Sequence, residues 1–114
     1  MATWTPGHGW HISAKRIAGT ARRLRDAGEE DLAVKQMTFA LDYELKALNT
    51  VLDNEFPDEE NIADFYKFAA IYALESDQPM QAAALLSAAL ERDVPEKLHR
   101  ELQRLLKDVQ TEAL

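Results

Sequence analysis

Hydrophobic residues recur along this chain at the spacing of an α-helix rather than that of a β-strand. Between residues 65 and 90, large and small side chains alternate at intervals of three and four positions. They are Phe65, Phe68, Ala69 and Tyr72, followed by Ala82, Leu86, Ala89 and Leu90. Large residues that face small ones let two helices approach closely. The pattern therefore predicts two short antiparallel helices joined by residues 75–79.

The helical spacing continues on both sides of this pair, and turn residues mark the ends of the segments. Gly28 stops the first segment. Asp58 fits a cap before the third, and Pro95 fits the first turn of the last. The expected helices lie near residues 13–27, 30–53, 59–75, 79–92 and 95–111.

These elements predict an all-α fold with five helices stacked as antiparallel hairpins. At 114 residues the chain has the size of one domain. We expect that domain over residues 12–114. Pro6, Gly7 and Gly9 disfavour regular structure before it, so residues 1–11 are expected to form an irregular N-terminal arm.

Two stretches match the pattern of the tetratricopeptide-repeat family, whose helix pairs carry large and small residues at fixed offsets. The first match comprises Ala21, Leu24, Gly28, Ala33, Met37, Ala40 and Leu41. The second comprises Phe65, Phe68, Ala69, Tyr72, Ala82, Leu86 and Ala89. The chain resembles a tetratricopeptide-like helical hairpin protein over roughly residues 14–110. The resemblance implies a short right-handed helical array.

Composition excludes several classes of protein. The chain has no cysteine, which excludes disulfides, thiolate catalysis and zinc–thiolate sites. The uncharged run over residues 78–90 is too short to span a bilayer, and residues 1–13 lack the apolar core of a signal peptide. We therefore expect a soluble cytoplasmic protein with no membrane partner.

The net charge of −7 is unevenly distributed. Residues 1–25 hold five basic side chains and no acidic one, whereas residues 26–91 hold fifteen acids and three lysines. This asymmetry is typical of a partner surface, and also of helix faces that are merely solvated. Nucleic-acid contact through the basic first helix ranks third among possible functions, because an acidic chain repels phosphate.

The sequence shows no arrangement typical of an enzyme or a metal site. No histidine lies near Ser76 or Ser87, and the glycines form no phosphate-binding loop. The pair His8 and His11, and the Glu96-x-x-His99 unit, lack the further ligands that a specific metal site needs. We expect no catalytic residue, no metal and no cofactor.

A protein–protein interaction module is the favoured function. In tetratricopeptide proteins a groove is lined by the first helix of each pair, and the resemblance places Lys15, Arg22, Arg25 and Tyr66 there. Arginine binds carboxylates bidentately, so the expected ligand is an acidic or C-terminal peptide segment of a partner. The alternative is that these cations only solvate the first helix.

The long second helix suggests a further contact. It outruns the partner helix that should cover it, and an uncovered apolar surface favours association. The residues expected at a homodimer interface are Tyr43, Ala47 and Val51, together with Trp4 and Trp10. An assembly-structural homodimer with no separate ligand is therefore the alternative function.

Overall fold

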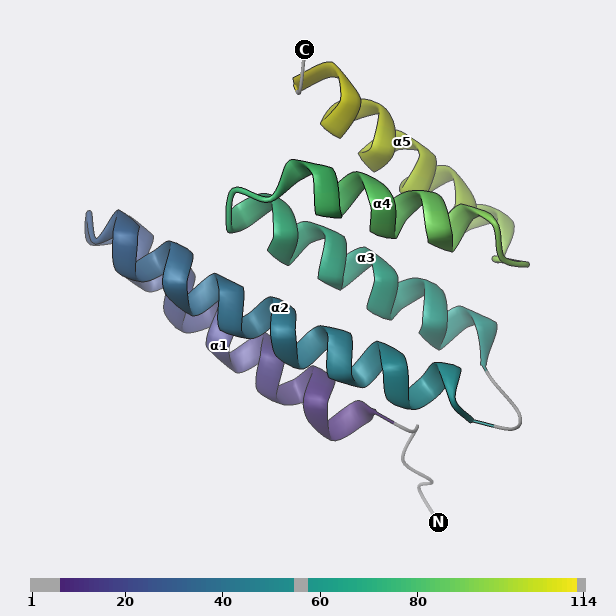
Figure 1. Ribbon diagram of the computed structural model, residues 1–114, viewed down its shortest axis with the longest axis horizontal. Coiled ribbons are helices and arrows are strands. Elements are labelled where there is room, and N and C mark those ends of the chain that lie inside the picture. The colour runs from purple at the N-terminus through teal and green to yellow at the C-terminus, as the bar shows by residue number, and fades with distance from the viewer. Residues whose placement is uncertain (1–6, 55–57, 113–114) are drawn as a thin grey trace.

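The computed structural model describes residues 7–54 and 58–112, and over these ranges the chain is all-α, with five helices and no strand (Figure 1). This confirms the all-α fold expected from the hydrophobic spacing. The helices are α1 (His8–Asp26), α2 (Glu30–Leu52), α3 (Glu59–Glu75), α4 (Pro79–Leu90) and α5 (Glu96–Glu112).

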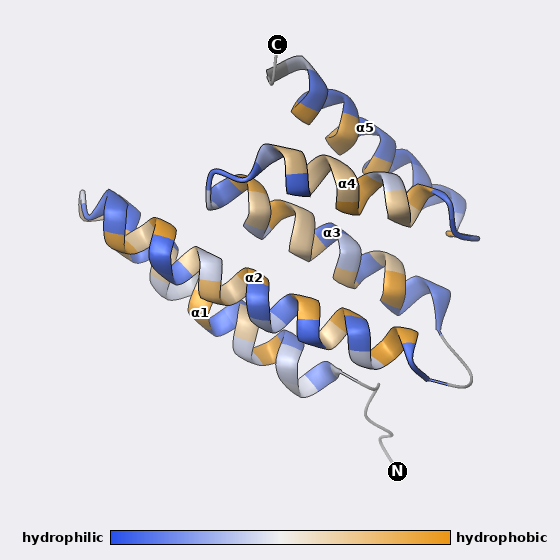
Figure 2. Ribbon diagram, viewed as in Figure 1, coloured by the Kyte–Doolittle hydropathy of each residue, from blue (hydrophilic) through white to orange (hydrophobic). Residues whose placement is uncertain are grey.

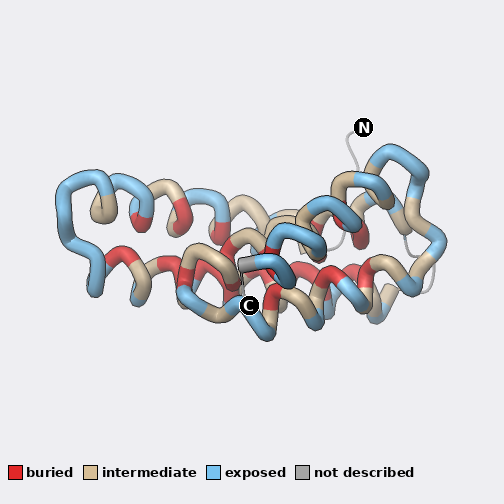
Figure 3. The backbone as a smooth tube through the Cα atoms, turned by 90° about the horizontal axis from the view of Figure 1, so that it is seen from above, coloured by how far each residue is buried: buried red, intermediate tan, exposed pale blue. Residues whose placement is uncertain are grey.

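The helices follow one another across the molecule in chain order, and each contacts the next. The molecule is a slab of 43 × 36 × 20 Å. Helices pack at about 8–10 Å between axes, so the short dimension accommodates two layers. Figure 3 shows the slab from its edge, with buried residues concentrated between the layers.

Local signals account for several helix ends. The Asp58 side chain accepts hydrogen bonds from the backbone N–H groups of Glu60 and Asn61, as expected of the α3 cap. Pro79 occupies the first turn of α4, where its missing N–H costs nothing. Gly28 follows α1 with φ of 84°, a left-handed conformation that glycine adopts without strain.

The start of α1 differs from the expected one. The helix begins at His8, so the part of the predicted arm over residues 8–11 is helical, whereas residues 1–6 lie outside the described part of the chain. The His11 N–H donates to the Gly7 carbonyl oxygen at 3.0 Å. Side chains of this first turn contact α2, and these contacts favour helix where the glycines disfavour it.

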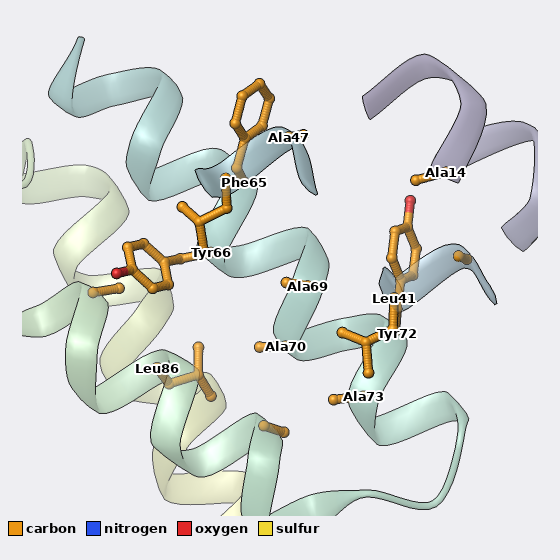
Figure 4. Packing of buried hydrophobic residues seen from close by; sticks show 14 of the residues in the cluster. Ala14, Leu41, Ala47, Phe65, Tyr66, Ala69, Ala70, Tyr72, Ala73 and Leu86 are labelled. Carbon is orange, nitrogen blue, oxygen red and sulfur yellow. The ribbon is translucent and has the colours of Figure 1, made fainter. Parts of the chain in front are cut away.

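Alanine dominates the contacts between helices. Ala14, Ala18 and Ala21 of α1 are at most 1% exposed, as are the α2 alanines Ala33, Ala40 and Ala47. Such small side chains let helix backbones approach closely. Larger residues fill the remaining space, among them Leu41, Tyr72 and Leu86 (Figure 4).

The last helix has one apolar side and one charged side, as its sequence predicts. Leu102 and Val109 are buried, with Leu98, Leu105 and Leu106 packed partly against the core. Figure 2 shows hydrophobic residues along one edge of α5 and hydrophilic residues along the other. Because α5 contacts α4 and α3, it covers the apolar surface of the preceding helix pair.

Gly7 provides a test of how α1 is attached. Its φ is 86°, and a Cβ built there would lie 2.4 Å from the Ala47 carbonyl oxygen. Gly7→Ala should therefore lower the free energy of unfolding by about 2–4 kcal/mol, through backbone strain and overpacking. Chemical denaturation followed by circular dichroism measures this loss.

Gly9→Ala is the matched control. A Cβ on Gly9 meets no atom within 4 Å, and the residue lies inside α1. This variant should be unchanged or up to about 1 kcal/mol more stable, because alanine favours helix over glycine. Equal losses in the two variants would contradict the close approach of Gly7 to α2.

Candidate functional site

Side chains of α1, α3 and α5 meet on one surface, which we call the α1/α3/α5 face. The Lys15 Nζ atom lies 5.9 Å from the centroid of the Phe68 ring, which links α1 to α3. The Lys67 Nζ atom lies 3.2 Å from the Glu101 Oε2 atom, which links α3 to α5. The face comprises Lys15, Asp64, Lys67, Phe68, Ile71, Glu101, Arg104 and Leu105.

A groove of about 260 Å³ lies on this face between α3 and α5. Its walls are Lys67, Ile71, Glu101, Arg104 and Leu105. Two of these residues are aliphatic and three are charged. Small-molecule sites commonly enclose about 300–1,000 Å³, so this groove has room for one or two side chains of a peptide rather than for a large cofactor.

The charges of the face are only partly paired. Lys67 and Glu101 bind each other. Lys15 and Arg104 are exposed, and neither makes an ion pair within 4 Å with a described residue. Burial raises the pKa of Asp64, an effect that Lys67 opposes. The face therefore offers two cations that are free to bind an anion.

A buried polar pair lies one turn before Lys15. The His11 Nδ1 atom is 2.5 Å from Glu44 Oε1 and 3.0 Å from Glu44 Oε2. Glu44 is fully buried, and the His11 ring lies 4.9 Å from the ring centroids of both Phe65 and Phe68. This pair joins α1 to α2, and its aromatic neighbours join it to α3.

Burial raises the pKa of Glu44, because removing a carboxylate from water penalises its charged form. The hydrogen bond and the charge of His11 act in the opposite direction. Hence His11, with a smaller contribution from the charge of Lys15, makes a buried carboxylate tolerable at this position. The pair acts as a structural support for the neighbouring face.

Two of the expected peptide-binding cations are engaged within the chain. The Arg22 Nε and Nη2 atoms donate to the two Glu75 carboxylate oxygens at 3.1 and 2.7 Å. That hydrogen bonding raises the pKa of Arg22. The Arg25 Nη2 atom donates to the Glu75 backbone oxygen at 2.7 Å, and its Nε atom donates to Glu30. Both arginines thus hold the end of α1 against the end of α3.

The structure does not bring Tyr66 together with these cations. Tyr66 is 9% exposed and points toward α4 and α5, whereas Tyr72 points toward Ala14 of α1 (Figure 4). The α3 residues on the face are Asp64, Lys67, Phe68 and Ile71, none of which the sequence pattern assigns to a binding surface. These residues recur at intervals of three and four positions, and Phe68, which belongs to the helix-packing pattern of the sequence, is only partly buried.

The residues expected at a dimer interface do not lie together on one exposed surface. Ala47 and Val51 are completely buried within the chain, so neither is available at its surface. Trp10 remains 41% exposed and stacks on Tyr43 at 5.5 Å between ring centroids. Trp4 lies outside the described residues.

Among the described residues, no cluster of three or more histidine or acidic side chains has the arrangement of a metal site. None of the helices in the described ranges combines the length and hydrophobicity required to cross a lipid bilayer.

The helices and the face define the chain as an all-α protein with a small, partly charged groove. A scan against protein-family models found no matching family, and searches among curated proteins and solved structures also found no match.

The His11–Glu44 pair generates a stability prediction. His11→Ala leaves Glu44 buried without its partner and should lower the free energy of unfolding by about 3 kcal/mol near neutral pH. Burial raises the pKa of Glu44, so folding favours the protonated form of this side chain. That contribution to stability is fully present below the ordinary glutamate pKa and is lost as the pH rises through the raised pKa. The loss should therefore shrink on acidification, as measured by denaturant unfolding at several pH values.

Glu44→Gln in the His11→Ala background serves as the control. Glutamine has nearly the same shape and no charge, so the double variant should recover part of the lost stability near neutral pH. A loss in His11→Ala that is the same at every pH, with no recovery in the double variant, would mean that the lost aromatic packing alone accounts for the effect.

Proposed function

We propose that this chain is a non-catalytic protein–protein interaction module whose α1/α3/α5 face binds an acidic or C-terminal peptide segment of a partner. The observation that carries the proposal is the groove between α3 and α5, where aliphatic Ile71 and Leu105 lie beside the cation Arg104. This combination suits a peptide that offers one apolar side chain and one carboxylate.

The order of the helices supports this use of the face. In a tetratricopeptide-like array the first helices of successive pairs line one groove. In the proposed assignment α1/α2 and α3/α4 are the pairs and α5 follows as the next first helix. The direct contact of α3 with α5, and the ion pair of Arg22 with Glu75 between α1 and α3, are consistent with that assignment.

The ligand-binding cations in this proposal differ from those expected from the sequence. Arg22 and Arg25 already bind groups of α3, whereas Arg104 and Lys15 have no ion-pair partner among the described residues. Arg104 is the better carboxylate ligand, because guanidinium binds both oxygens at once. Lys15 adds positive potential at the far end of the face. The expectations of no cofactor and of a cytoplasmic location remain predictions.

The test is binding of fluorescent peptides that end in an aliphatic residue with a free carboxylate, measured by anisotropy. The wild type should bind acidic members of such a library. Arg104→Glu should weaken binding by about tenfold or more, the effect of losing a hydrogen bond to a charged group. Amidation of the peptide C-terminus should weaken wild-type binding where the terminal carboxylate is the recognised group.

Arg16→Glu provides the matched control. Arg16 is exposed on α1 outside the face and makes no ion pair within 4 Å with a described residue, so its reversal changes the net charge equally. It should leave the affinity nearly unchanged. Equal weakening by both variants would indicate general charge attraction, and no binding by the wild type would remove the groove proposal.

A further inference from the structure

The outer surface of α2 exposes an aromatic side chain near its middle. Phe39 is 44% exposed, although α2 is otherwise packed between α1 and α3. Four charged residues flank it along the same helix, and all of them are exposed: Asp31, Lys35, Asp42 and Lys46. We call these four residues and Phe39 the α2 outer strip.

The charges of this strip have no ion-pair partner within 4 Å among the described residues. Asp31 and Lys35, and likewise Asp42 and Lys46, have the spacing at which pairs can form along one helix. Lys46 instead lies over the rings of Trp10 and Tyr43, at 4.9 and 5.2 Å from their centroids. Pairing within the helix therefore does not account for the pattern.

The pattern is symmetric about the middle of the strip. Counted from the midpoint between residues 38 and 39, Lys35 and Asp42 lie at equal distances on opposite sides, about 5 Å along the axis. Asp31 and Lys46 also lie at equal distances, about 11 Å from the midpoint. In both cases the two equivalent positions carry opposite charges.

We propose that a second copy of this chain docks on the α2 outer strip, with the two α2 helices antiparallel about a two-fold axis beside Phe39. In this arrangement Lys35 faces Asp42 of the other copy, and Asp31 faces its Lys46. By symmetry each pairing occurs twice, and no like charges meet. The two Phe39 side chains bury each other at the centre.

The neighbouring aromatic residues enlarge this interface. Trp10 is 41% exposed and stacks on Tyr43 beside the strip, so apolar surface extends from α2 onto α1. Stable interfaces bury about 800 Å² on each partner, and α2 has 23 residues, or about 34 Å of length, along which to do so. A parallel pairing in register would instead place each charged residue against the same residue of the other copy, so that like charges would meet.

This proposal does not rest on the peptide-binding function. The strip belongs to α2, and the groove belongs to α3 and α5. Docking of a second copy on α2 leaves the groove residues uncovered. Failure of peptide binding and failure of dimerisation are therefore separate results.

The first test is sedimentation equilibrium over a wide range of protein concentration. The wild type should form a dimer, and Phe39→Glu should weaken it by at least about tenfold, because it places two carboxylates together at the centre. Met80→Glu is the control, since Met80 is 86% exposed on α4 and lies outside the strip. Circular dichroism verifies that each variant is folded.

A charge exchange tests the pairing itself. Lys35→Glu should weaken the dimer, because the carboxylate introduced at this position then meets Asp42 of the other copy. Adding Asp42→Lys should restore the affinity toward that of the wild type, since the pair is rebuilt with its signs reversed. The two substituted positions are seven residues apart on one helix, so this recovery arises between copies rather than within one.

The absence of native cysteine allows a test of orientation by disulfide formation. A chain with Lys35→Cys mixed with a chain with Asp42→Cys should form a mixed disulfide on oxidation. Lys35→Cys alone should crosslink far less, because its two copies lie about 10 Å apart along the axis.

Three results would each overturn the proposal. They are a monomeric wild type at every concentration, a dimer that Phe39→Glu leaves intact, and crosslinking of Lys35→Cys to itself in preference to the mixed pair. If the wild type is monomeric at every concentration, a second copy of this chain is not the partner of the strip.

Discussion

Close approach of helices through small side chains determines where every other side chain of this protein lies. Ala14, Ala18 and Ala21 occupy the contact of α1 with α2, and fully buried alanines recur between α3 and α4. With little volume between the backbones, each helix has few rotations that fill space without overlap. Gly7 extends the same constraint to the end of α1, where even one methyl group would meet the backbone of α2. The positions of the exposed charges follow from this packing.

Polar contacts then select how α1 lies across the other helices. The His11–Glu44 pair joins the first turn of α1 to α2, and the Arg22–Glu75 pair joins its last turns to α3. The buried pair depends on full pairing, because an isolated carboxylate in the core is costly. The exposed Arg22 pair contributes less to stability but is bidentate and directional. Together they hold Lys15 beside Phe68 and so build one side of the α1/α3/α5 face.

The proposed functions use two different consequences of this packing. On the α1/α3/α5 face, the groove combines two aliphatic residues with the cation Arg104, which makes no ion pair with a described residue. On the α2 outer strip, Phe39 lies among charges that no described residue pairs. Because the two surfaces do not share residues, a dimer through α2 would carry two grooves. Two linked grooves bind a partner with two peptide segments more tightly than either does alone, since the second contact becomes intramolecular.

The helices and most of their ends can be predicted from the sequence alone, because they depend on neighbours in the chain. Periodicity, the Asp58 cap and the glycine at position 28 act within about one helical turn. Tertiary structure decided which residues meet. The start of α1 depends on the contact of His11 with Glu44, which lies 33 positions away. Arg22 is unavailable to a ligand because it binds Glu75, which lies 53 positions away. Tyr66 and Lys67 are adjacent in sequence, yet only the rotation of α3 against α4 and α5 places one in the core and the other in the groove.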